Sequence, residues 1–86
     1  MSSLDETYAA LSHFWRAFVD FNDAVRVSAA DLQDKHTDLE GLWNDNAART
    51  YAQIYDPLDT ALKQYLSQEA PRMEDFIALK VRLLDS

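Results

Sequence analysis

The stretch Gly41-Leu42-Trp43-Asn44-Asp45-Asn46-Ala47-Ala48 stands at the midpoint of an 86-residue chain and decides how its two halves are arranged. Gly41 is the only glycine, so we expect it to end a helix as the C′ residue in a left-handed conformation. Asn44 or Asp45 can then cap the next helix with a side-chain oxygen. The stretch therefore predicts a helix, a tight corner at Trp43 and a returning helix.

An apolar repeat runs through the first half of the chain, with spacings that alternate between four and three residues. Its members are Leu4, Tyr8, Leu11, Trp15, Phe18, Asn22, Val25, Ala29, Leu32, His36 and Leu39. The pattern predicts one helix over about residues 3–40, with a length of about 55 Å. Asn22 either sets the register of helix pairing or lies at the rim and binds water. His36 is interpreted as a partly buried histidine with satisfied hydrogen bonds, not as a metal ligand.

The apolar face of this first helix is wider than the pairing of two helices requires. Phe14 and Phe21 lie one heptad apart beside the repeat, and Val19 lies on its other flank. A face of this width suits a bundle of three or four helices. We therefore take Phe14, Phe21 and Val19 as candidate interface residues. The expected partner is a second copy or a paralogous hairpin, with which the chain dimerises into a four-helix bundle.

The second half carries a similar repeat that two prolines interrupt. Its members are Ala48, Tyr51, Tyr55, Leu58, Leu62, Tyr65, Glu69, Met73, Phe76, Ile77, Lys80, Leu83 and Leu84. Because the repeat keeps its phase through Pro57, we predict one helix over about residues 44–84, kinked near Pro57 and Pro71. The fold class is then an all-α antiparallel two-helix hairpin forming a single domain, 1–86. The alternative is a bundle of three or four helices whose last helix, about 71–85, folds back.

The charge of the chain narrows the classes of partner. Asp and Glu number 15 against 8 Lys and Arg, which gives a formal net charge of -7. Such a chain repels phosphate backbones, so we expect no nucleic-acid partner.

No apolar run approaches the ~20 residues that cross a bilayer, and the N-terminus lacks the pattern of a cleavable signal peptide. We expect a cytoplasmic protein, or one secreted without a cleavable signal peptide.

Motifs for metal binding and catalysis are absent from the sequence. The chain has no cysteine, no Glu-x-x-His pair of the kind found in di-iron bundles, and no EF-hand loop. With one glycine it has no phosphate-cradling loop, and no serine stands in a nucleophile elbow. We therefore predict no cofactor, no metal and no enzymatic activity.

At the corner, Trp43 is followed by Ala47-Ala48 and then Tyr51. This segment resembles the WXG-type family of small secreted helical hairpins associated with type VII secretion. The resemblance implies two antiparallel helices with the tryptophan in the loop between them. In this chain the turn motif consists of Gly41, Trp43 and Asp45, so the glycine precedes the tryptophan and an aspartate stands two residues after it.

The same resemblance implies an export signal, in which a tyrosine is followed four residues later by an acid. Tyr65 with Glu69 is the candidate, and Tyr55 with Asp59 is a second match. The function expected is association with other proteins, as a secretion-system substrate or partner subunit. The alternative is a cytosolic coiled-coil adaptor or chaperone-like subunit that is not exported. Trp43 either staples the corner or docks a partner.

Overall fold

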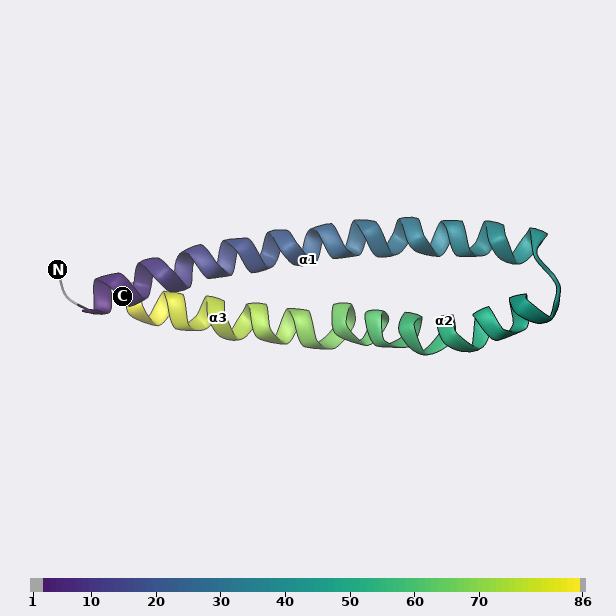
Figure 1. Cartoon of the computed structure of the whole chain (residues 1–86). Helices are drawn as coiled ribbons and strands as arrows, with labels where there is room; N and C mark the ends of the chain where they lie inside the picture. The colour runs from purple at the N-terminus through teal and green to yellow at the C-terminus, as the bar shows by residue number, and fades with distance from the viewer. Residues whose placement is uncertain (1–2, 86) are drawn as a thin grey trace.

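The computed structural model describes residues 3–85, which form helices and no strand. The elements are α1 (Ser3–Leu42), α2 (Asn46–Gln64), a π-helical segment η1 (Tyr65–Glu69) and α3 (Ala70–Asp85). Figure 1 shows α2, η1 and α3 following one another and returning beside α1, so that α1 starts where α3 ends. The rod measures 63 × 16 × 16 Å. The predicted helical hairpin is confirmed, and the alternative in which the last helix folds back is wrong.

The prediction that Gly41 ends the first helix is wrong. α1 continues through Gly41 to Leu42, and no described glycine has a positive φ angle. The last helical hydrogen bond is donated by the Trp43 N–H to the carbonyl of Leu39, at 2.8 Å. The chain then turns at Asp45, whose backbone is extended (φ -120°, ψ -171°). Because an ordinary extended residue makes this corner, no left-handed residue is needed.

The side of α1 that faces the returning helices follows most of the predicted repeat. The partly or fully buried positions of α1 are Tyr8, Leu11, Ser12, Trp15, Phe18, Val19, Asn22, Val25, Ala29, Gln33 and His36. Leu4, Leu32 and Leu39 were expected in this contact but are exposed. A straight α-helix has 3.6 residues per turn, so a strict seven-residue repeat drifts away from the contact line. Beyond Ala29 this drift brings Gln33 inward in place of Leu32.

The returning chain contains one π turn, where the backbone N–H of Ala70 bonds to the carbonyl of Tyr65, five residues earlier. The wide turn comes directly before Pro71, which has no N–H and whose ring would clash with a carbonyl four residues earlier in a regular α-helix. The π turn adds one residue to the helix. After it, the contact with α1 therefore moves from the predicted Glu69 and Met73 to Ala70 and Glu74.

Pro57 lies inside α2, which continues on both sides of it as one α-helix. The returning helix thus spans Asn46–Asp85, close to the predicted 44–84, with its irregularity at the π turn before Pro71. α1 lies closest to α3, and the buried apolar residues there are Ala70 and Ile77. Along α2 the helices stand further apart, and aromatic side chains fill the space between them.

Candidate functional site: an uncharged flank beside two polar clusters

The corner is built by one cap and one aromatic contact. The carboxylate of Asp45 accepts a hydrogen bond of 2.9 Å from the Ala48 N–H, so this turn-motif residue is the N-cap of α2. Trp43 is half-buried, and its ring centroid lies 5.5 Å from that of Tyr51 in a tilted arrangement. Of the three turn-motif residues, Trp43 and Asp45 hold the corner, whereas Gly41 belongs to α1.

An aromatic cluster behind the corner joins α1 to α2. The ring of His36 stacks on that of Tyr55 with centroids 3.8 Å apart, and its Nδ1 lies 2.9 Å from the Tyr51 hydroxyl. Its Nε2 lies 3.3 Å from a carboxylate oxygen of Glu40. His36 is therefore a buried histidine with partners on both ring nitrogens, and within residues 3–85 no group of His, Asp and Glu forms a metal site.

Burial also acts on Tyr55, a residue that is 7% exposed. Its pKa is raised above the ordinary tyrosine value, first because burial disfavours the phenolate and then because the carboxylate of Asp59 lies nearby. The carboxylate of Asp59 in turn forms an ion pair with the ammonium group of Lys63, at 2.7 Å. Tyr55 and Asp59, the second match to an export signal, are thus both engaged in contacts within the hairpin.

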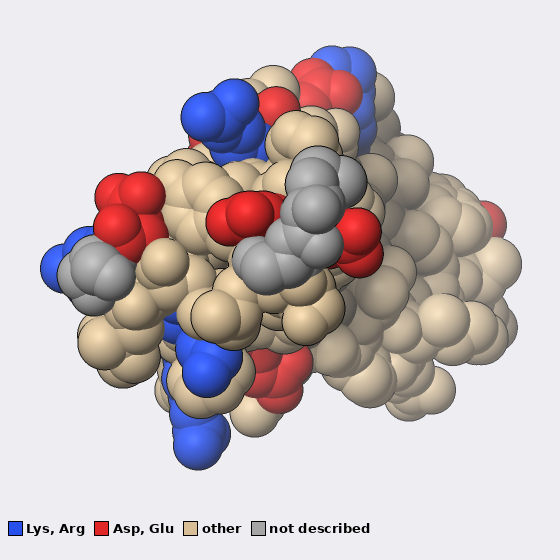
Figure 2. Space-filling view, turned by 90° about the vertical axis from the view of Figure 1, so that its left-hand side faces the viewer, with Lys and Arg blue, Asp and Glu red and all other residues tan. Residues whose placement is uncertain are grey.

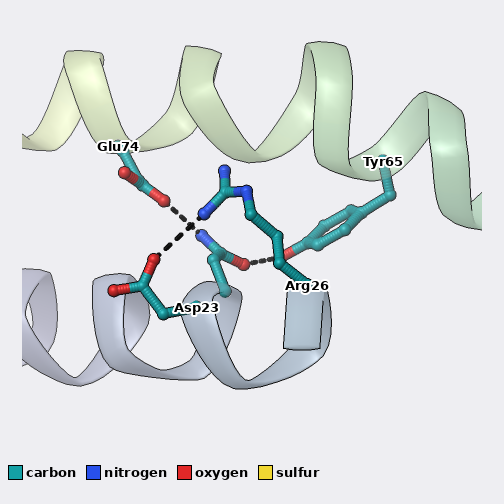
Figure 3. Close-up of polar contacts among 5 residues, drawn as sticks. Asp23, Arg26, Tyr65 and Glu74 are labelled. Carbon is teal, nitrogen blue, oxygen red and sulfur yellow. Dashed lines mark hydrogen bonds and ion pairs between the residues drawn. The ribbon is translucent and has the colours of Figure 1, made fainter. Parts of the chain in front are cut away.

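A polar network crosses the middle of the hairpin (Figure 3). Asn22 is completely buried, and its side-chain amide donates to the carboxylate of Glu74 at 2.7 Å. Its carbonyl oxygen accepts a hydrogen bond of 2.7 Å from the Tyr65 hydroxyl. Beside it, Arg26 pairs with Asp23 at 3.1 Å. Asn22 thus pairs with side chains of the opposite helix instead of lying at the rim.

The candidate export signal is split between the inside and the outside of the hairpin. Tyr65 and Glu69 are the first and last residues of η1. Tyr65 is half-buried and directs its hydroxyl to Asn22, whereas Glu69 is exposed. Tyr65 belongs to the predicted repeat of the second half, so its inward position follows from the spacing, but the spacing does not show that its hydroxyl donates to Asn22 on the other helix.

One flank of the rod carries almost no charge, as the right-hand side of Figure 2 shows. Between Thr7 and Ser28 of α1 it consists of the exposed positions one residue before the buried ones, and we call these the α1 stripe. They are Thr7, Ala10, Phe14, Ala17, Phe21, Ala24 and Ser28, and all are exposed. Phe14 is 46% and Phe21 56% exposed. Of the candidate interface residues, these two share the α1 stripe, and Val19 lies half-buried on the opposite flank.

The same flank is hollowed where α1 faces α2. An apolar groove of about 270 Å³ is lined by Phe21, Val25 and Leu32 of α1 together with Leu62 of α2. Small side chains of α1, among them Ala24 and Ser28, form its floor. The groove is open and apolar, which suits apolar side chains from another protein better than a polar small molecule.

No described helix is long and apolar enough to span a membrane. Comparison of the chain with family models, with curated proteins and with solved structures gives no match in any of the three.

Proposed function

We propose that this chain is a protein-association module without catalytic activity. It would pair through its uncharged flank with a second helical hairpin, either its own copy or a paralogue, to form a four-helix bundle. The observation that carries the proposal is the row of exposed apolar side chains on that flank, with Phe14 and Phe21 at its centre. Solvent-exposed apolar surface of this kind usually marks an interaction site.

The acidic charge supports the same proposal. Although the net charge is -7, the α1 stripe contains no Asp or Glu between Thr7 and Ser28. Two hairpins can therefore meet through the α1 stripe without bringing carboxylates of α1 into the contact. Burying one phenylalanine side chain contributes about 1.5–3 kcal/mol. The two rings of each hairpin would supply much of the free energy of association.

The resemblance to WXG-type hairpins supports a role in a secretion system, as a substrate or partner subunit. A cytosolic adaptor that is not exported is the second candidate. Replacing Glu69 by Ala separates them, because Glu69 is exposed and its side chain forms no hydrogen bond or ion pair within residues 3–85 of its own chain. Loss of export with unchanged helicity would favour the secretion role, and unchanged export would remove Glu69 from any signal.

Sedimentation equilibrium tests the association itself. We expect a species of twice the 9.9 kDa chain mass, with Phe21→Glu weakening association by about a hundredfold because one ring is lost from each hairpin. Val27→Glu is the matched control, since Val27 is 72% exposed on α1 but lies away from the flank. A single-chain mass at all concentrations, unchanged by a paralogous hairpin, would contradict the proposal.

A further inference from the structure

The α1 stripe has a symmetric order of side-chain sizes. From Ala10 to Ala24 it alternates alanine and phenylalanine, with the rings of Phe14 and Phe21 on either side of Ala17. The next positions outward, Thr7 and Ser28, both carry hydroxyls. Reversing the direction of the stripe leaves this order unchanged. A two-fold symmetric contact requires such a pattern, since residue i of one copy meets residue j of the other and the reverse.

The returning chain carries a second stripe on the same flank, at Glu69, Met73, Phe76 and Lys80. These exposed positions also lie one residue before the buried ones, Ala70 among them. In two antiparallel right-handed helices, positions one residue before the contact fall on the same flank. Reversing this second stripe places Met73 against Phe76, and it places the carboxylate of Glu69 against the ammonium group of Lys80.

The two stripes have their centres at the same level of the rod. Asn22 bonds to both Tyr65 and Glu74, so the position opposite Asn22 is at about residue 70. The centre of the α1 stripe, midway between Phe14 and Phe21, lies about four and a half residues before Asn22. In an antiparallel pair with the same rise per residue, this level on α3 is about four and a half residues after 70. That is midway between Met73 and Phe76.

From this shared centre we propose that the partner is a second copy of this chain, related by a two-fold axis perpendicular to the rod at the level of Ala17. The inference rests on the proposed association and specifies its partner and geometry. α1 packs on α1 of the partner, and α3 packs on the partner's α3, both antiparallel. Phe14 then lies beside the partner's Phe21, and two symmetric Glu69–Lys80 pairs flank the contact. The two corners project at opposite ends.

A different two-fold arrangement, with both corners at one end, fits the flank less well. There α1 would lie on the partner's returning helix, and Lys80 and Glu69 would face the alanines and phenylalanines of the α1 stripe. Each charge would lose water without gaining an opposite charge, which costs free energy. Within residues 3–85 of one chain, neither Glu69 nor Lys80 takes part in an ion pair. In the dimer with the two-fold axis perpendicular to the rod, each of these side chains gains an ion pair with the other copy.

Cysteine cross-linking of the full chain tests the geometry, and the chain has no native cysteine to interfere. In the proposed dimer Ala17 faces its own copy, so Ala17→Cys alone should form a disulfide-linked dimer under mild oxidation. The double variant Ala10→Cys with Ala24→Cys should cross-link as well, because each position meets the other in the second copy. Val27→Cys, on the far side of α1, is the control and should stay uncross-linked.

Charge reversal tests the register independently. Glu69→Lys or Lys80→Glu should each weaken dimerisation about tenfold, because two attractive pairs become repulsive. The double variant, which restores opposite charges, should recover the original affinity. A dimer that fails to cross-link at Ala17, or a chain that binds only a paralogue, overturns the inference and leaves the proposed function standing. A single-chain mass with no hairpin partner overturns both.

Discussion

The side-chain amide of Asn22 donates a 2.7 Å hydrogen bond to the carboxylate of Glu74, 52 residues further along the chain. The same side chain accepts a hydrogen bond from Tyr65, so one buried amide ties α1 to both η1 and α3. A buried polar group costs free energy unless it is paired. This network therefore favours the one alignment of the two halves in which all three side chains meet.

Replacing Asn22 by Asp tests that coupling with little change of shape. The new carboxylate would be buried against Glu74, so its folded-state pKa should lie above the unfolded value of about 3.9. The loss in free energy of unfolding caused by Asn22→Asp should be small below about pH 4 and grow as the pH rises, reaching about 3 kcal/mol or more at neutral pH. Urea denaturation at several pH values measures this loss. Asn44→Asp, at an exposed position, should show no comparable loss.

Gly41→Ala should stabilise the hairpin by about 0.5–1 kcal/mol, because Gly41 is inside α1 and alanine is the better helix former. A Cβ added there meets no atom within 4 Å. Ala30→Gly, at an exposed position of the same helix, should destabilise by a similar amount. If thermal denaturation instead showed that Gly41→Ala destabilises, the backbone at Gly41 would have to be left-handed.

Trp43→Ala distinguishes a corner staple from a docking residue. Since the ring is half-buried against Tyr51, its removal should lower the free energy of unfolding by about 2–3 kcal/mol. Trp43→Phe should keep most of that contact. Unchanged stability in the alanine variant, combined with loss of association, would assign Trp43 to a partner surface.

Several features could be predicted from residue spacing, because they follow from the period of an α-helix. Most of the seam of α1 and the exposed positions of Phe14 and Phe21 beside it are of this kind, whereas side-chain chemistry narrowed the cap to Asn44 or Asp45, of which Asp45 makes it. Glu74 could not be found in this way, since counting in heptads assumes α-helix throughout and one extra residue in η1 moves every later position. Gly41 misled for a different reason: a sole glycine at a corner suggests a left-handed residue, but the extended Asp45 made one unnecessary.

The raised pKa of Tyr55 predicts a loss of stability in alkali. The folded state favours the neutral phenol, so this contribution is complete below the unfolded pKa of about 10 and is lost as the pH rises through the higher folded value. Above about pH 10 the native chain should therefore lose more stability than Tyr55→Phe, which keeps the stacked ring without the hydroxyl. Tyr8→Phe, remote from this cluster, should follow the native chain in urea denaturation. If the free energy of unfolding fell with pH equally for Tyr55→Phe and the native chain, the prediction would be contradicted.

The π turn gives the last prediction, which concerns a deletion. Because η1 contains one residue more than an α-helical turn, deleting the exposed Ser67 should restore regular helix and keep both flanking segments in contact with α1. Pro71→Ala should accompany the deletion, since a regular helix would bring the proline ring against a carbonyl. We expect the combined variant to keep its helical content, with a free energy of unfolding within about 1 kcal/mol of that of Pro71→Ala alone.

Deleting the exposed Thr60 from α2 is the control. It would rotate every later residue by about 100° around the helix axis and should largely unfold the hairpin. If circular dichroism and urea denaturation showed equal damage from the two deletions, the extra residue of η1 would not be what aligns Tyr65 and Glu74 with Asn22.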